Sequence, residues 1–192
     1  MTAEPNPDRR SQRARRAILD ATFDLAVANG YAKLTIEAIA ARAKVGKPTI
    51  YRWWPSKGAV ALDALNERIG HTTDFPDTGD IAADLAHQIT AVAAMFLGDV
   101  GAVYRGIIGE AQHDPALNAA VRATIIEPRA QQCAARLDAA VAAGQLRADL
   151  PTRSMVDLFY GPLYYRFLLG DPAGVPQVPD LVPEIINGLR PA

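Results

Sequence analysis

The segment TIYRWWPSK, residues 49–57, combines aromatic and basic side chains at unusual density. Aromatic residues gathered this closely usually belong to a core, yet here cations alternate with them. Arg52 can donate two hydrogen bonds to the acceptors on a guanine edge. Tyr51 and Trp53 carry a polar donor on a flat apolar body, so each can donate to phosphate while packing on a scaffold. Trp54 falls on the opposite helical face, where we expect a core position. The segment therefore suits contact with DNA.

The elements that must position this segment are two short helices joined by a tight turn. Residues 35–43 form the first helix, with Thr35 as its N-cap, and residues 47–53 form the second. The turn between them spans residues 44–46. Helices over residues 8–29 and 56–70 flank the pair, the second with Ser56 as its N-cap. This order predicts a helix-turn-helix, whose second helix enters the major groove with its leading residues.

The charge distribution supports the same interpretation. Residues 1–70 carry 12 basic and 7 acidic residues, a net charge of +5, whereas residues 71–192 carry 8 and 14, a net charge of −6. Cations at a helix N-terminus oppose the helix dipole, which favours a neighbouring polyanion. The alternative is a frayed basic tail without a specific role. The cations at the start of the first helix are Arg9, Arg10, Arg13, Arg15 and Arg16.

Beyond residue 79 nearly the whole chain has the periodicity of amphipathic helices. Apolar stripes run through residues 81–96, 117–125 and 155–168. We expect Pro128 to kink or interrupt the second of these helices, and Gly161-Pro162 to break the third. No alternating strand pattern of useful length occurs. The predicted fold class is all-α.

Several other classes of protein are disfavoured. No apolar run approaches the roughly 20 residues that cross a bilayer, and the N-terminal arginines precede no apolar signal region, so we expect a cytoplasmic protein without a membrane partner. The single cysteine, Cys133, excludes an intramolecular disulfide. His71, His87 and His113 have no metal-like spacing. No catalytic arrangement can be placed, so we expect no enzyme, no metal and no cofactor.

Residues 12–60 resemble the DNA-binding domain of the TetR family of bacterial transcriptional regulators. At motif level the resemblance covers about a quarter of the chain. Lys44, Gly46 and Pro48 depart from the family pattern, in which glycine, serine and a small residue are common; the turn must therefore hold a non-glycine residue or take another shape. The matching residues are Ala17-Ile18-Leu19-Asp20-Ala21, Asn29-Gly30-Tyr31, Leu34-Thr35-Ile36, Ile39-Ala40, Val45-Gly46-Lys47, Thr49-Ile50-Tyr51, Trp54 and Lys57.

The resemblance implies a homodimer that binds double-stranded DNA. Six of its expected DNA contacts come from the family, and Pro48, Arg52 and Arg13 are added from the chemistry and position of the residues. Lys57 is expected to place its cation on phosphate at the start of the following helix. The full set of expected DNA contacts is Thr35, Lys47, Pro48, Thr49, Tyr51, Arg52, Trp53, Lys57 and Arg13.

The resemblance also implies a C-terminal domain that binds a small-molecule effector and dimerises through its last two helices. The segment Gly161–Arg166 resembles part of one C-terminal domain type of the family. Plain core positions are the alternative for every pocket candidate, and the sequence does not separate pocket aromatics from interface aromatics. The pocket candidates are Met95, Phe96, Tyr104, Ile108, Gln112, Phe159 and Tyr160, and the interface candidates are Tyr164, Tyr165, Phe167, Leu168 and Ile185.

These features predict an N-terminal arm (1–8), a helix-turn-helix domain (9–55), a connecting helix and linker (56–78) and a helical ligand-binding and dimerisation domain (79–192). The expected function is a repressor whose homodimer binds a pseudo-palindromic operator and is released by a ligand. One alternative is an activator or a regulator controlled by a protein partner. Another is a helical enzyme with a degenerate DNA-binding domain.

Overall fold

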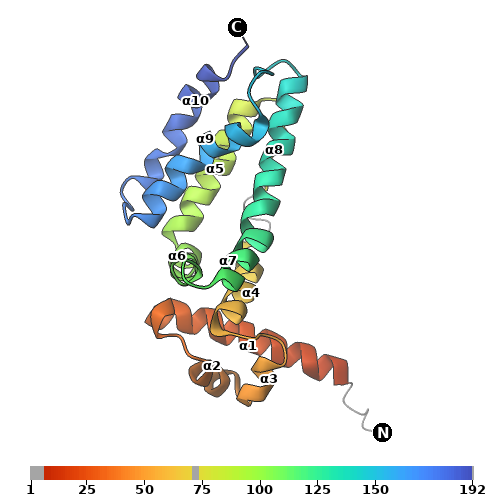
Figure 1. Cartoon of the computed structure of the whole chain (residues 1–192), viewed down its shortest axis with the longest axis vertical. Coiled ribbons are helices and arrows are strands. Elements are labelled where there is room, and N and C mark those ends of the chain that lie inside the picture. The colour runs from red at the N-terminus through yellow and green to blue at the C-terminus, as the bar shows by residue number, and fades with distance from the viewer. Residues whose placement is uncertain (1–6, 71–73, 192) are drawn as a thin grey trace. The chain divides into compact units, whose positions relative to one another are not determined.

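The computed structural model describes residues 7–70 and 74–191, without the side chains of residues 7–10 (Figure 1). His71 and most of the expected N-terminal arm lie outside the described residues. Those that are described form helices and connecting segments, with no strand among them. The predicted all-α class is confirmed. Within this part of the chain no single helix is long and apolar enough to cross a membrane, although α5 (Ile81–Leu97) and α6 (Asp99–Ala111) reach the required length and composition when taken together.

The helices group into two compact units. Unit 1 contains the described residues up to Arg68 together with Ala102–Val121, and unit 2 contains Ile69–Gly101 and the chain from Arg122 onward. The chain first passes from unit 1 to unit 2 after Arg68, within the connecting helix and linker that were expected over residues 56–78. The inclusion of Ala102–Val121 in unit 1 differs from the expected continuous domain over residues 79–192. Its cause is close backbone packing of this segment on the N-terminal helices, described below.

In unit 1, local capping signals set several of the helix starts. The Thr35 hydroxyl accepts a hydrogen bond from the Ala38 amide at 3.1 Å, and the Ser56 hydroxyl accepts one from Ala59 at 3.1 Å. Both N-caps are as predicted. The elements are α1 (Pro7–Asn29), the 3-10 turn η1 (Tyr31–Lys33), α2 (Ile36–Ala43), α3 (Lys47–Tyr51), α4 (Lys57–Ile69), α6 (Asp99–Ala111) and α7 (Pro115–Val121).

Helix α3 is shorter than the sequence indicates. It ends at Tyr51 instead of near Trp53. The amides of Trp53 and Trp54 both donate to the Ile50 carbonyl, each at 3.0 Å, so the chain tightens into a turn at this point. The turn directs the two tryptophans toward different surroundings.

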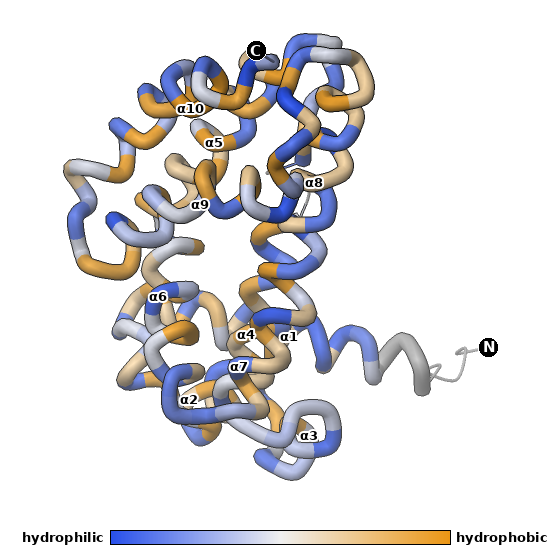
Figure 2. The backbone as a smooth tube through the Cα atoms, turned by 45° about the horizontal axis from the view of Figure 1, so that its top comes forward, coloured by the Kyte–Doolittle hydropathy of each residue, from blue (hydrophilic) through white to orange (hydrophobic). Residues whose placement is uncertain are grey.

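Unit 2 is a helical bundle in which hydrophobic and hydrophilic residues alternate along the chain (Figure 2). The apolar sides of α5, α8 and α9 pack against one another, with Leu85, Leu137 and Leu163 fully buried. The elements are α5 (Ile81–Leu97), the π-helical segment η2 (Arg122–Ile126), α8 (Glu127–Ala142), α9 (Thr152–Leu168), the 3-10 turns η3 (Val175–Gln177) and η4 (Pro179–Leu181), and α10 (Val182–Gly188).

The two prolines expected to disturb helices behave differently. Before Pro128 the backbone widens into η2, so the expected interruption is confirmed. At Pro162 the expected break is wrong, because α9 runs through it without interruption. Proline removes one helical hydrogen bond there. Phe159 and Leu163, buried on either side of Pro162, supply the packing that keeps the helix continuous.

A buried ion pair joins α5 to α8 in unit 2. One Asp84 carboxylate oxygen accepts hydrogen bonds from Arg136 Nε at 2.8 Å and Nη2 at 2.5 Å. Thr78 donates to the same carboxylate from its hydroxyl and its amide. Burial would raise the pKa of Asp84, but the hydrogen bonds from Thr78 and Arg136 outweigh it and hold the pKa below its ordinary value. The pair therefore stays charged inside the bundle.

We predict that Asp84→Ala destabilises the protein by about 3 kcal/mol, because Arg136 keeps a buried charge and loses its main partner. The cost lies at the lower end of the usual range, since the exposed Asp77 also approaches Arg136, at 3.6 Å. Urea unfolding followed by circular dichroism measures the change. As a control, Asp149→Ala removes an equally close but exposed partner from Arg147 and should leave stability nearly unchanged.

The Asp84–Arg136 pair also makes the free energy of unfolding depend on pH. Because the pKa of Asp84 is lowered in the folded state, its contribution is complete above about pH 4, the ordinary Asp range, and is lost as the pH falls further. The stability difference between wild type and Asp84→Ala should therefore shrink on acidification. A difference that grows at low pH would contradict this account of the pair.

Candidate nucleic-acid interface

The turn between α2 and α3 accommodates a lysine where glycine is common in the TetR pattern. Lys44 has a left-handed backbone, with φ of 55°, and caps α2 through its amide. Its side chain is exposed. Of the two possibilities left by the sequence, the turn therefore holds a non-glycine residue, at some conformational cost. Gly46 then begins α3 without a side-chain cap.

Helix α3 has one buried and one exposed face. Ile50 is fully buried, which anchors the helix in unit 1. Lys47, Pro48 and Arg52 are exposed, and Tyr51 is 52% exposed. The other two expected contacts on this segment, Thr49 and Trp53, are half-buried, and Thr35 is exposed at the start of α2. The structure thus brings most of the expected contacts to the outside of one short helix and its C-terminal turn.

Trp54, which follows α3, is held in place by contacts with α1 and α4. Its side chain is buried, as predicted, and its Nε1 donates to Asp63 of α4 at 3.0 Å. The same Asp63 oxygen accepts a hydrogen bond from Arg15 of α1 at 2.6 Å, while Arg15 also binds Glu67 at 2.8 Å. The Arg15 guanidinium lies 5.9 Å from the Trp54 ring. These four residues, which we call the Asp63 clamp, connect α1, α4 and the turn after α3.

Trp53 supports the side chain expected to read bases. Its ring meets Trp54 edge-on, with centroids 5.3 Å apart. The Arg52 guanidinium lies 5.6 Å from the Trp53 ring, within the range of a cation–π contact. Arg52 is thereby oriented while it remains exposed. Stacking restricts the side chain before any partner binds, which lowers the entropic cost of ordering it.

The Lys57 ammonium was expected to bind phosphate, but in the structure it is engaged by other groups of the protein. Its Nζ forms an ion pair with Glu110 of α6 at 2.6 Å and sits 4.5 Å from the centre of the Tyr31 ring. Lys47 also has a carboxylate partner, Glu37, at 3.1 Å, but both of these side chains are exposed. Lys47 can therefore exchange its partner more easily than Lys57 can. The sequence offered no signal for the Glu110 contact.

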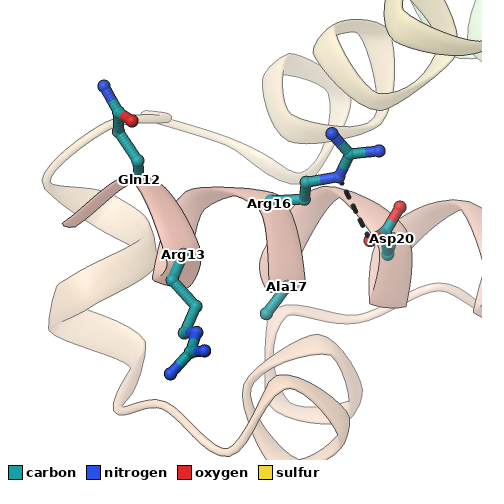
Figure 3. Close-up of a pocket in the computed structure, with 5 residues that line it drawn as sticks. All are labelled: Gln12, Arg13, Arg16, Ala17 and Asp20. Carbon is teal, nitrogen blue, oxygen red and sulfur yellow. Dashed lines mark ion pairs between the residues drawn. The ribbon is translucent and has the colours of Figure 1, made fainter. Parts of the chain in front are cut away.

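The cations of α1 have different surroundings. Arg15 was expected among the cations available to a polyanion, but it belongs to the Asp63 clamp and is paired with Asp63 and Glu67. Arg13 is exposed and makes no ion pair among the residues that the structure describes. Arg16 approaches Asp20 at 4.0 Å (Figure 3). A shallow hollow of about 470 Å³ along this part of α1 is lined by Gln12, Arg13, Arg16, Ala17 and Asp20.

The seven pocket candidates do not fall within one unit. Met95, Phe96, Phe159 and Tyr160 belong to unit 2, whereas the other three lie on α6 or just beyond it, in unit 1. Of these three, Gln112 is exposed and donates to the carbonyl of Ile108 in its own helix at 3.2 Å, and Tyr104 is buried.

In unit 2, Phe96 belongs to an aromatic cluster. Its ring stacks on Phe167 with a centroid distance of 4.0 Å, and Tyr164 meets it edge-on at 5.3 Å. Phe167 is fully buried within the chain, so it has no surface to offer a second copy. Tyr164 and Ile185 are half-buried. Tyr165 and Leu168, with exposures of 68% and 40%, are the interface candidates that remain on the surface.

A group of polar side chains lies near the Tyr160 hydroxyl inside unit 2. The hydroxyl and the Arg129 Nε are buried and have no hydrogen-bond partner among the described residues. Gln88 of α5 and Cys133 of α8 lie close enough to influence the tyrosine, whose pKa is raised chiefly by burial. Sequence reasoning selected only Tyr160 of this group. No cluster of His, Cys, Asp and Glu suited to a metal ion occurs within the described part of the chain.

A short helix with a basic, aromatic outer face, following α2 across a tight turn, defines a helix-turn-helix DNA-binding protein. Comparison with known families agrees. Residues 18–64 match the family model for bacterial regulatory proteins of the tetR family, and residues 75–185 match the tetracyclin repressor-like C-terminal domain. The chain therefore belongs to the TetR family, and it is a DNA-binding transcriptional regulator.

Similar proteins extend this match over almost the whole chain. YdeS, an HTH-type transcriptional regulator of Bacillus subtilis (strain 168), is 35% identical over 94% of this chain and 92% of its own. The DNA-binding transcriptional repressor TetR of Mycobacteroides abscessus is 26% identical over 88% of this chain and 90% of its own. The crystal structure of the TetR family transcription regulator SCO0332 is 37% identical, with a TM-score of 0.75 and coverage of 93% and 99%.

We predict that Trp54→Phe lowers stability by about 2 kcal/mol, because it removes apolar volume and the hydrogen bond to Asp63. Equilibrium unfolding in urea measures the change. Trp53→Phe is the matched control: Trp53 is half-buried and lies outside the Asp63 clamp, so its loss should cost clearly less. Equal costs for the two substitutions would show that the Asp63 clamp does not hold the α3 region.

Proposed function

We propose that this chain is a repressor whose homodimer binds a pseudo-palindromic operator through α3 and is released by a small molecule held in unit 2. The observation that carries the DNA-binding part is the two-faced α3, with Ile50 buried and Lys47, Tyr51 and Arg52 directed outward. The similarity to a relative named as a repressor supports the direction of the output. Its action on DNA implies a cytoplasmic location.

In this proposal the side chains of the surface divide into those that read bases and those that bind the DNA backbone. Arg52 reads guanine by donating to two acceptors, and Thr49 offers a hydroxyl and a methyl group to neighbouring bases. Lys47 and Tyr51 bind phosphate, as does Arg13 from α1. Pro48, Trp53 and Thr35 complete the surface against the backbone of the groove.

Two copies must be joined so that their α3 helices lie about 34–36 Å apart, one turn of DNA. We propose that the surface of α9 makes this connection. Leu158, Tyr165 and Leu168 are exposed apolar residues at helical spacings of seven and three, and so share one side of the helix. Burying such a stripe against its copy would remove apolar surface from water at a site where aromatic residues are favoured.

We place the effector near Tyr160 in unit 2. A buried polar atom without a partner costs about 1–3 kcal/mol, and unit 2 holds two such atoms, one on α8 and one on α9. A bound molecule that accepts hydrogen bonds from the Tyr160 hydroxyl and the Arg129 Nε would give both atoms a partner, with apolar contacts from Phe159 and Met95. Among proteins of similar fold, at 21% identity and a TM-score of 0.68, is the flavonoid-responsive regulator FrrA.

The DNA-binding proposal predicts sequence-selective, salt-dependent binding. Purified protein mixed with fragmented genomic DNA of the encoding organism should enrich a pseudo-palindrome. Affinity for that site should fall steeply with salt, because several phosphate contacts release counterions. Arg52→Ala should relax the preference at one base position by about 1–3 kcal/mol, whereas Lys47→Ala should weaken binding to all sequences equally. Competition binding to single-base variants of the site measures both effects.

Arg190→Ala serves as a control, because it removes one exposed positive charge from unit 2. It should leave the base preference and the salt dependence unchanged. If Arg52→Ala and Lys47→Ala both reduce affinity uniformly, Arg52 is not a base reader. If no sequence is enriched even at low salt, α3 is not a DNA-reading surface.

The effector proposal predicts that Tyr160→Phe stabilises the ligand-free protein by about 1 kcal/mol, since it removes a buried hydroxyl without a partner. Tyr165→Phe, at an exposed position of the same helix, should have no effect. Urea unfolding of both variants makes the comparison. A loss of stability in Tyr160→Phe would show that the hydroxyl has a structural role and would remove the argument for a ligand at this position.

A further inference from the structure

Lys57 has two possible partners in unit 1, a DNA phosphate and the Glu110 carboxylate. It is the first residue of α4, directly after the α3 region, where a cation is expected to bind phosphate. Yet its ammonium is engaged by Glu110 at 2.6 Å, and the two side chains keep only 26% and 33% of their surfaces exposed. Partial burial strengthens such a pair relative to an ion pair in open solvent.

The Tyr31 ring closes a second side of the ammonium. The Lys57 Nζ lies 4.5 Å from the ring centre, which places the cation on an aromatic face as well as on a carboxylate. Tyr31 itself is buried, and its burial, together with the nearby Glu110 carboxylate, raises the pKa of its hydroxyl. The ring therefore stays neutral and in place. A phosphate that reached this ammonium would compete with the Glu110 carboxylate for its positive charge.

Two glycines allow the segments that carry Glu110 and Lys57 to pack closely against their neighbours. A Cβ on Gly106 of α6 would lie 2.5 Å from the Tyr31 Cβ, and a Cβ on Gly58 of α4 would lie 2.7 Å from a Leu117 methyl group. At both glycines a neighbouring side chain occupies the space that a Cβ would fill. Because packing this tight tolerates little drift, a displacement of α6 would move the Glu110 carboxylate relative to Lys57.

We propose that Glu110 is a positioning residue that sets DNA affinity by competing with phosphate for the ammonium of Lys57. With the ion pair formed, Lys57 is withheld from DNA and binding is weaker. When α6 moves the carboxylate away, the ammonium becomes available to phosphate and binding strengthens. This inference rests on the proposed DNA contact of α4 and adds a means of regulation to it.

The test uses the full-length protein and a labelled duplex carrying the site enriched from genomic DNA, with a random duplex of equal length beside it. Glu110→Gln keeps the size of the side chain and removes its charge. We expect affinity for both duplexes to rise about three- to tenfold at low salt, and the slope of log affinity against log salt to steepen by about one. Lys57→Met should weaken binding and flatten the slope, and adding Glu110→Gln to it should have no further effect.

Two variants keep the result specific. Glu184→Gln removes an exposed carboxylate of α10 and controls for net charge alone; it should not change the slope. Glu110→Asp retains the charge but shortens its reach, and should give an intermediate affinity if Glu110→Gln does not fold. Unchanged or weaker binding by folded Glu110→Gln would overturn the inference, as would an equal gain in the Lys57→Met background. An absence of salt-dependent DNA binding by the wild type would instead overturn the proposed function itself.

Discussion

The proposed DNA-reading surface depends on one carboxylate, that of Asp63. It accepts hydrogen bonds from Arg15, which approaches from α1, and from the Trp54 indole, which follows α3. A helix of five residues has little stability of its own, so its orientation must come from tertiary contacts. The Asp63 clamp provides these contacts on one side and the buried Ile50 on the other. Tyr51 and Arg52 face outward because their neighbours are held inward.

Charge has distinct roles in the two units. In unit 1, carboxylates restrain cations that a count of basic residues would assign to DNA: Asp63 and Glu67 hold Arg15, and Glu110 holds Lys57. In unit 2, Asp84 and Arg136 form a buried pair that joins α5 to α8. A basic patch is therefore defined by the cations that carboxylates do not hold. For this chain, Arg13 and Arg52 meet that description better than Arg15 or Lys57.

The division of the chain into two units matters for function because of the segment that contains most of α6. The segment Ala102–Val121 follows a helix of unit 2 in sequence and yet packs with unit 1. Glycines at 58 and 106 make this possible, because each leaves room for a side chain of the neighbouring segment. The arrangement places a carboxylate from the middle of the chain beside the start of α4. Regulation through such a contact needs no change in the exposed face of α3 itself.

The sequence by itself determined the features that arise from neighbouring residues. The N-caps Thr35 and Ser56, the turn at Lys44 and the inward position of Trp54 follow from local hydrogen bonding and helical periodicity, and all were predictable. Tertiary structure alone decided the remainder. Residues 53 positions apart meet in the Lys57–Glu110 pair, and α9 continues through Pro162 because its flanking residues are buried. Such outcomes depend on packing between distant segments, whose free energy exceeds the local preference and leaves no mark in the local pattern.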